Sequence, residues 1–438
     1  MHIKTLPRDD HSCGWYELLP EPRPPAILSG NQAADWVIVG AGFVGLSAAR
    51  RLAVLRPHDR ILLIEGLRVG QGASGRNSGF IIDLPHKRDL ESPDIDHKRR
   101  IMRLNEAAIT SLEETISENG ISCEWSRAGR YQGAVGTRGI QYLKSYRTLL
   151  DNINHPYQWF DRDALHTILG TSYYEAAIYI PTGILMNPAA LVRGLGETLP
   201  SNVEMYENSP VTAIKRTNGR FELATPRGSI RTPKLLLGTN VFSSEFGFLR
   251  GRMVPVMTFA SITRPLTEDE MLKFGGRDDW GLTPADHAGT TLRFTRDRRL
   301  IIRNQHRFAP KYSSDARDLA IVRRNHRAGL LARYPWMEDV GLDYTWGGVC
   351  GMSRNYSAFF GKLEDGVYAS ACHQAVGAAR GTTSGMLLAD MATGQNSELL
   401  SDMITVSGMP AANPPEPFLS IGVKARMKYA AWASRGER

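Results

Sequence analysis

The stretch VIVGAGFVGLSAARRL at residues 37–52 joins an apolar strand to an apolar helix through three glycines, Gly40, Gly42 and Gly45. In this spacing the first glycine permits a tight turn, the second lets a ligand approach the backbone, and the third lets the helix pack closely on the strand. The free N–H groups and the dipole at the start of such a helix favour an anion. The stretch therefore predicts a Rossmann-like α/β domain that holds a pyrophosphate at this turn.

The residues around the turn complete a βαβ unit. DWVIVG at 35–40 is predicted as the first strand and RILLIEG at 60–66 as the second, so the unit closes within about 30 residues, the length it requires. Glu65 ends the second strand, about 20 residues beyond the glycines, where a carboxylate accepts hydrogen bonds from both ribose hydroxyls. A carboxylate also repels a 2′-phosphate, so NAD or FAD is predicted in preference to NADP.

A second loop decides between these two dinucleotides. GLRVGQGASGRNSGFI at 66–81 is dense in small residues and contains one arginine beyond Arg68. Running past a bound dinucleotide, it offers backbone N–H groups, the hydroxyls of Ser74 and Ser78 and the amide of Asn77. Arg76 is predicted to bring positive charge toward phosphate or flavin. A simple NAD dehydrogenase does not need this loop, so it favours FAD.

Together, VIVGAGFVGLSAARRL, LLIEG and GASGRNSGF resemble the FAD-dependent amine and amino-acid oxidases of the D-amino-acid oxidase superfamily. The likeness is strongest to the γ-glutamylputrescine oxidase-like branch, whose members carry an ASGRN-G segment. Glycine oxidase and sarcosine oxidase are similar more distantly. The resemblance continues, in the expected order, at residues 182–199, 208–216, 344–361 and 366–394.

The resemblance implies further cofactor contacts. Val211, in NSPVTAIKR, corresponds to the valine that meets the adenine. Many relatives place a Gly-x-x-Gly-x-Gly pattern against the flavin pyrimidine ring. Here those positions read Cys372-His-Gln-Ala375-Val-Gly377, so only Gly377 keeps the pattern. In sarcosine-oxidase relatives a cysteine in the region of Cys350 links covalently to the flavin. We expect non-covalent FAD, with a link to Cys350 as the alternative.

The chemistry that the resemblance implies is hydride transfer from the α-C–H of a neutral amine to flavin N5. The imine hydrolyses to a carbonyl product, and O2 is the expected electron acceptor. Because the cofactor carries the difficult electronics, the protein mainly positions substrate and excludes water. The catalytic candidates are His373, which could orient substrate or accept a proton near neutral pH, and Trp346, as an aromatic wall around an amine. The alternatives are a hydrogen-bonded turn for His373 and core packing for Trp346.

Other residues are candidates for the substrate side. A substrate that bears a carboxylate needs an arginine that can bind it through two hydrogen bonds. Arg252, Arg293 and Arg303 are the candidates in the second β-rich block, and Tyr173 and Tyr174 are further lining candidates. The sequence does not choose among them.

Composition bounds the remaining possibilities. The chain has 438 residues, 42% hydrophobic and 22% charged, with a formal charge of +8, as expected of a globular protein. No apolar run approaches the roughly 20 residues needed to span a bilayer, and the N-terminus lacks the apolar core of a signal peptide. The four cysteines lack metal-site spacing. We expect a cytoplasmic protein without a metal site or a transmembrane segment.

The expected partners are a small amine substrate and O2 or another electron acceptor, without nucleic acid. Three alternatives remain. The first is an FAD oxidoreductase that acts on a modified tRNA base, suggested by the net positive charge. The second is an amine dehydrogenase with an acceptor other than O2, and the third is a non-enzymatic dinucleotide-binding protein.

The pattern predicts a fold in which a discontinuous Rossmann-like FAD-binding domain carries an inserted substrate domain of antiparallel β-sheet plus helices. Helices are expected to end at Gly120 and to begin at Asn187, a good N-cap residue followed by Pro188. The predicted segments are 1–34 (an extension wrapped over the surface), 35–100, 186–248 and 342–400 (FAD-binding domain), 101–185 and 249–341 (substrate domain) and 401–438 (C-terminal tail).

Overall fold

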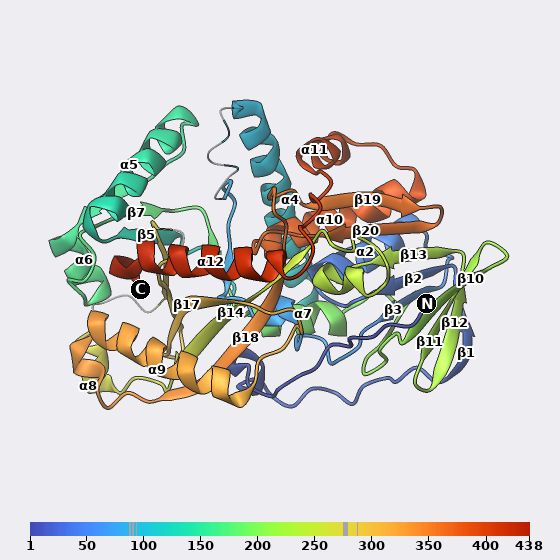
Figure 1. The fold of residues 1–438 in the computed structure, drawn as a ribbon, viewed down its shortest axis with the longest axis horizontal. Helices are drawn as coiled ribbons and strands as arrows, with labels where there is room; N and C mark the ends of the chain where they lie inside the picture. The colour runs from blue at the N-terminus through green and yellow to red at the C-terminus, as the bar shows by residue number, and fades with distance from the viewer. Residues whose placement is uncertain (87–88, 90–91, 93, 275–278, 287) are drawn as a thin grey trace.

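A computed structural model of the chain describes residues 1–86, 89, 92, 94–274, 279–286 and 288–438 (Figure 1). A six-stranded sheet with the order β19-β20-β13-β2-β3-β9 forms the nucleotide-binding half. All of its neighbouring strands are parallel except the edge pair β19 and β20. Its strands are β2 (Trp36–Val39), β3 (Ile61–Ile64), β9 (Val203–Tyr206), β13 (Lys234–Leu237), β19 (Phe359–Glu364) and β20 (Val367–Ala371).

Both faces of this sheet are covered, as the continuous apolar strands require. On one face, α2 (Phe43–Leu55) and α10 (Gly377–Thr393) pack in a cluster that includes Ile38, Leu46 and Leu388. On the other face lies a four-stranded sheet of the order β1-β12-β11-β10. Its strands are β1 (Gly30–Ala33), β10 (Ala213–Thr217), β11 (Arg220–Thr225) and β12 (Gly228–Thr232).

An eight-stranded sheet forms the other half of the molecule, with the order β18-β14-β17-β16-β15-β5-β7-β6. It is antiparallel except for the β15 and β5 pair, which is parallel. Its strands are β5 (Arg130–Ala134), β6 (Gln158–Asp161), β7 (Ala176–Ile180), β14 (Val254–Thr263), β15 (Trp280–Pro284), β16 (Thr291–Phe294), β17 (Leu300–Phe308) and β18 (Leu342–Met352). Figure 1 shows this sheet beside the six-stranded one, with α12 crossing the front.

The remaining helices cover these sheets and fill the space between them. Helix α9 packs on β17 and β18, α5 on β5, and α4 on α10. These helices and short elements are α1 (Gly14–Glu17), α4 (Ile95–Asn119), α5 (Gly136–Asn152), α6 (Arg162–Leu169), α7 (Pro188–Glu197), α8 (Glu268–Met271), α9 (Ala316–Arg333), α11 (Glu398–Val406), α12 (Phe418–Ala433), η1 (Ala73–Gly75), η2 (Asn240–Ser244), η3 (Pro335–Met337), η4 (Arg435–Glu437), β4 (Phe80–Ile81) and β8 (Ile184–Leu185).

The structure confirms the α/β fold class and several local predictions. Helix α4 ends at Gly120, whose φ of 61° is the left-handed conformation that suits glycine. Helix α7 begins after Asn187, whose side chain accepts a hydrogen bond from Ala190 N. The proposed division into domains stays a prediction. Two elements connect the halves: β18, predicted in the FAD-binding domain, lies in the eight-stranded sheet, and α4, mostly in the predicted substrate segment, packs on α10.

Residues 1–34 pack on the rest of the chain, with most of their side chains exposed or half-buried. Trp15 in α1 is buried, and β1 pairs with β12 in the four-stranded sheet. Residues 3–10, apart from Lys4, line an internal cavity. Among the described residues, no helix is long and apolar enough to cross a membrane.

Candidate active site

The glycine turn between β2 and α2 is built as its spacing predicts. Gly40 has a φ of 97°. A Cβ on Gly45 would lie 1.8 Å from the Gly40 carbonyl oxygen, and a Cβ on Gly42 would lie 2.7 Å from Ser74 Oγ. No side chain caps the start of α2. The turn therefore presents backbone directly to the adjoining space.

That space is a cavity of about 440 Å³, within the range of small-molecule sites, which we call the cofactor cavity. It lies beyond the carboxyl ends of β2, β3 and β13, where dinucleotides bind in such sheets. The predicted cofactor residues that line it are Gly40, Gly42, Glu65, Ser74, Arg76, Asn77, Val211 and Gly377. Gly45 lies behind the turn, against Gly40, and Ser78 lines an adjoining cavity instead.

Glu65 is held in place by the backbone of two loops. Its Oε2 accepts from Ala41 N at 2.8 Å, and its Oε1 accepts from Leu67 N at 3.0 Å. Burial raises the pKa of this carboxyl group above its ordinary value. Because each carboxylate oxygen can accept two hydrogen bonds, both oxygens keep capacity for ribose hydroxyls. The residues present therefore fit the adenosine half of a dinucleotide.

The loop around η1 packs against the glycine turn. Ser74 Oγ accepts from Phe43 N at 3.2 Å. Asn77 donates from Nδ2 to Ser74 O at 2.7 Å, and its Oδ1 accepts from Gly79 N at 2.8 Å. The amide of Asn77 is therefore used within its own loop, which differs from the predicted donation to the cofactor.

Arg76 also differs from its prediction. Its Nη2 forms ion pairs with Asp9 and with Asp10, the latter at 2.9 Å, and its Nη1 donates to Gly347 O at 2.9 Å. Two carboxylates compensate one guanidinium, so Arg76 does not bring net positive charge to a phosphate. It joins the N-terminal segment, the η1 loop and β18.

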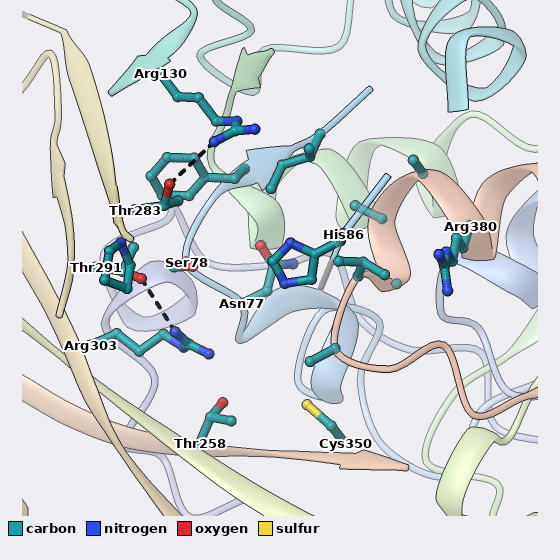
Figure 2. Close-up of a pocket in the computed structure, with 18 of the residues that line it drawn as sticks. Asn77, Ser78, His86, Arg130, Thr258, Thr283, Thr291, Arg303, Cys350 and Arg380 are labelled. Atoms are coloured by element: carbon teal, nitrogen blue, oxygen red, sulfur yellow. Dashed lines mark hydrogen bonds between the residues drawn. The ribbon is translucent and has the colours of Figure 1, made fainter. Parts of the chain in front are cut away.

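A second cavity of about 190 Å³ opens beside the first (Figure 2), and we call it the substrate cavity. The two cavities share Ala73, Arg76, Asn77, Cys350, Ala375, Gly377 and Ala378. They therefore meet at the start of α10 and at β18.

Four arginines line the substrate cavity, and two of them are paired with carboxylates. Arg76 is paired as described, and Arg380 is paired with Asp89. Arg303 Nη1 donates to Thr291 Oγ1 at 3.3 Å, and Arg130 donates to Thr283 Oγ1 at 3.3 Å and to a tyrosine hydroxyl (Figure 2).

Neither Arg130 nor Arg303 has a carboxylate within ion-pairing distance in the described part of the chain. Burial lowers the pKa of Arg303. Burying a charge without a counter-charge costs free energy. Two such cations in one cavity indicate that its ligand is an anion.

The other substrate-side candidates lie elsewhere. Arg293 is fully buried and paired with Asp279, and Arg252 donates to Pro410 O at 2.8 Å. Tyr174 packs in the core under the eight-stranded sheet beside Tyr173. None of these four arginine or tyrosine side chains lines either cavity. Of the predicted substrate-side residues, Arg303 is the one that lines the substrate cavity.

His373 is buried and lines the cofactor cavity. Burial, with Arg380 nearby, lowers its pKa to about 4. The ring is therefore neutral at pH 7 and is a weak base, which disfavours the predicted role of proton acceptor. Its Nε2 has no hydrogen-bond partner among the described residues. An unsatisfied buried nitrogen beside the cavity fits a cofactor contact.

The loop before α10 keeps a glycine-like backbone at the positions where the glycine pattern is lost. Cys372 and Ala375 stand where relatives have glycine, and their φ angles are 61° and 64°. The backbone keeps the left-handed conformation that glycine adopts without cost. No side chain caps the start of α10, and Gly377 and Ala378 line both cavities. The amino end of α10 therefore faces the junction with free N–H groups.

Trp346 is not part of the site. It is fully buried in a cluster with Trp15 and Ile262, and its Nε1 donates to Arg76 O at 3.1 Å. It lines neither cavity. The aromatic wall predicted from its place before two glycines is wrong, because its side chain points into the core. Cys350, four residues further along β18, does line both cavities.

Sequence reasoning missed Arg130 and the acidic pair Asp9 and Asp10. Arg130 begins a short strand after Gly129, a context that does not separate it from other surface arginines. Asp9 and Asp10 lie in a proline-containing segment without periodicity. Their partners are far away in the sequence, so no local signal identifies them.

Comparison with known proteins agrees with this geometry. Residues 35–391 match the model of the DAO family, described as FAD dependent oxidoreductase. A probable oxidoreductase OrdL of Haemophilus influenzae is 26% identical over 386 residues, covering 85% of this chain and 86% of the relative. The gamma-glutamylputrescine oxidoreductase of Escherichia coli is 23% identical over 375 residues, covering 84% and 85%.

A solved structure, the glycine oxidase of Geobacillus kaustophilus, superposes with a TM-score of 0.71 at 19% identity, covering 84% of this chain and 96% of that one. At this identity the likeness establishes the fold alone. The family match includes all strands of the six-stranded and eight-stranded sheets. The chain belongs to the DAO family of FAD-dependent oxidoreductases.

Proposed function

We propose that the chain binds FAD without a covalent link and oxidises the C–N bond of a small amine that carries a carboxylate. The observation that carries this proposal is the pair of adjoining cavities. One has the glycine turn and Glu65 of a dinucleotide site, and the other has Arg130 and Arg303, neither of which forms an ion pair among the described residues.

FAD, when bound, supplies the group that accepts a hydride from the carbon next to the substrate nitrogen. The residues of the chain orient the substrate for this step. Arg303, which lies in β17, binds the substrate carboxylate, and its hydrogen bond to Thr291 Oγ1 orients the guanidinium. Cys350 and the start of α10, which line both cavities, would hold the flavin end of the cofactor.

The amino end of α10 stabilises negative charge at the junction. Its unsatisfied N–H groups at Gly377 and Ala378 and its dipole act together there. Neutral His373 is suited to hydrogen bonding and not to taking up a proton at pH 7. No strong base is needed, because a neutral amine loses hydride and its product imine hydrolyses in water. O2 is the proposed electron acceptor.

The test is a spectroscopic one on the purified protein. We expect a flavin absorption band that is bleached under anaerobic conditions by an amine bearing a carboxylate. The matching amine without the carboxylate should bleach it far more slowly. In air, turnover should release hydrogen peroxide. Bleaching without peroxide would replace O2 by another acceptor, and equal bleaching by both amines would exclude the carboxylate-bearing substrate class.

A further inference from the structure

The N-terminal segment forms one wall of the cofactor cavity. Residues 3–10, apart from Lys4, line it together with the glycine turn and Glu65. The segment passes close to the β3 end, where a Cβ on Gly66 would lie 2.8 Å from Pro7 Cγ. Since the family match begins at residue 35, this wall lies outside the part of the chain that the family model describes. We call residues 3–10 the strap.

The strap is fixed on the side of the four-stranded sheet. The amino group of Met1 donates to Ile214 O at 2.7 Å, and Ile3 N donates to Thr212 O at 2.9 Å. Thr5 N donates to Glu245 Oε2 at 3.2 Å. These bonds hold the first residues of the chain beside β10.

The other end of the strap is fixed by Asp9 and Asp10, which both form ion pairs with Arg76. The side chains of Asp9 and Arg76 are nearly buried, at 8% and 7% exposed, whereas that of Asp10 is 32% exposed. Asp9 Oδ2 also accepts from Gln71 Nε2 at 2.6 Å. Just beyond the strap, Trp15 Nε1 donates to Asn77 O at 2.9 Å. The strap is therefore fastened to the η1 loop, which itself contacts the cofactor turn.

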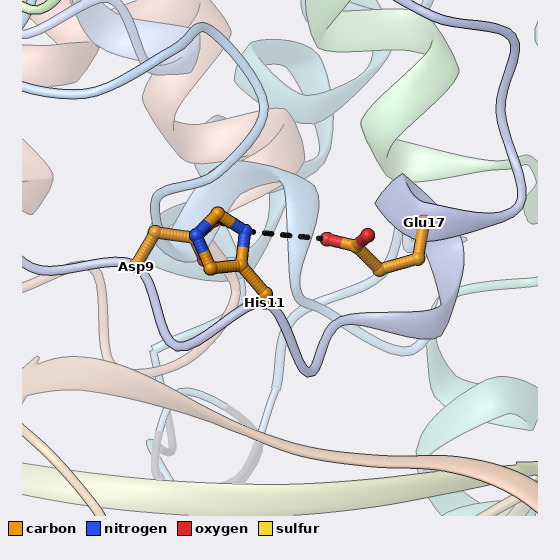
Figure 3. Close-up of side chains that lie close together, drawn as sticks. All are labelled: Asp9, His11 and Glu17. Carbon is orange, nitrogen blue, oxygen red and sulfur yellow. Dashed lines mark ion pairs between the residues drawn. The ribbon is translucent and has the colours of Figure 1, made fainter.

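His11 and Glu17 extend this fastening (Figure 3). His11 Nδ1 lies 3.2 Å from Asp9 Oδ2 and 3.9 Å from Glu17 Oε1. These three side chains lie close enough together for a metal-binding group, but Arg76 already pairs with Asp9, and its positive charge disfavours a cation there. We interpret the group as polar contacts at the end of the strap.

Between its two fixed ends the strap crosses the cavity with Leu6, Pro7 and Arg8. Arg8 has no carboxylate partner among the described residues, so its charge is available to an anionic dinucleotide. A ligand seated against the glycine turn and Glu65 would also lie against this part of the strap. Leaving the cavity on this side then requires one end of the strap to detach.

We propose that the strap retains the cofactor, and that the ion pair between Asp9 and Arg76 is the contact that sets the rate of FAD release. The proposal rests on the proposed function in one respect, that FAD occupies the cofactor cavity. Breaking a nearly buried ion pair is strongly destabilising for the contact it holds, so opening becomes more frequent when Asp9 loses its charge.

The first test compares the full-length holoprotein with its Asp9→Asn variant. Release is followed as the rise of free-flavin fluorescence after dilution. We expect FAD release to be at least about tenfold faster in Asp9→Asn, because losing the ion pair should raise the equilibrium constant for opening of the strap by about tenfold or more. Asp365→Asn, which removes an exposed ion pair with Lys362, should release FAD at the wild-type rate. Equal rates in all three proteins would overturn the proposal.

A second test does not depend on a variant that folds. Trypsin cuts after Arg8, and the released peptide is measured by mass spectrometry in FAD-loaded and flavin-stripped wild-type protein. We expect cutting at Arg8 to be at least about tenfold slower with FAD bound, because a ligand that touches the strap stabilises its docked state. Equal cutting in both samples would overturn the proposal that the strap retains the cofactor. A purified protein that takes up no flavin would instead overturn the proposed function.

Discussion

Replacing Arg303 by glutamine tests the substrate side most sharply. Among the described residues the guanidinium makes one hydrogen bond, from Nη1 to Thr291 Oγ1 at 3.3 Å, so its other donors are available to a ligand in the cavity. A hydrogen bond to a charged group contributes about 1.5–3 kcal/mol. Losing it predicts a fall in kcat/KM of about 10- to 150-fold for an amine that carries a carboxylate.

The assay is anaerobic flavin reduction in a stopped-flow instrument, with the acid substrate and its uncharged carboxamide. In the Arg303→Gln variant we expect the loss for the acid only, because the carboxamide offers no charge for the arginine to pair with. Arg252→Gln is the matched control, since Arg252 lies outside both cavities and donates to Pro410 O. An equal loss for the acid and the carboxamide, or an equal loss in the control, would refute the reasoning.

The unfolding free energy should be little affected by Arg303→Gln. The variant removes a buried cation that has no carboxylate partner in the described part of the chain, so it leaves no orphaned acid. A large drop in thermal stability would mean that Arg303 holds the sheet together and would weaken its assignment to the substrate.

Further predictions concern cofactor, loop and C-terminus. Glu65→Ala should weaken FAD binding by about tenfold or more in flavin titrations, because two charged hydrogen-bond acceptors for ribose are lost; unchanged affinity would contradict the adenosine placement. Ala375→Gly should raise the free energy of unfolding by about 0.5–1 kcal/mol, because Ala375 is exposed and has a φ of 64°; a lowered melting temperature would count against this. Denatured protein should show no added flavin mass, and a mass retained in wild type but lost in Cys350→Ser would reveal a covalent link. Burial raises the pKa of Glu437 from 4.5 to about 7. Between pH 4.5 and pH 7 the folded state therefore holds a proton on Glu437 that the unfolded state has lost. The stabilisation by this group is present at pH 4.5 and is lost as the pH rises to 7. Thermal unfolding at pH 5 and pH 8 should show this loss in wild type and not in Glu437→Gln.

The cofactor side was predictable because its signals are local. The glycine spacing, the strand ends and the acid at Glu65 lie within 30 residues or so of one another. The fold follows from the same patterns: continuous apolar strands at β2 and β3, a capping asparagine at Asn187, and Gly120 at the end of α4. Each of these features is set by neighbours in the sequence.

The substrate side and the strap depend on contacts between distant segments. Arg76 fits a phosphate contact until Asp9, 67 residues earlier in the chain, is seen to pair with it. Trp346 precedes two glycines in a suitable motif, but its side chain faces the core. Arg293 and Arg303 lie on adjacent strands, and only the register of β16 and β17 and the ion pair of Arg293 with Asp279 separate their roles.

The central claim is that one chain joins an FAD site to a cavity for an anionic amine. Anaerobic titration of the purified yellow protein tests it most directly, with a small amino acid and its decarboxylated amine as a matched pair. The account predicts that the amino acid bleaches the flavin band, at a rate that Arg303→Gln lowers and Arg252→Gln does not. A protein that binds no flavin, or a flavin that no carboxylate-bearing amine reduces, would contradict it.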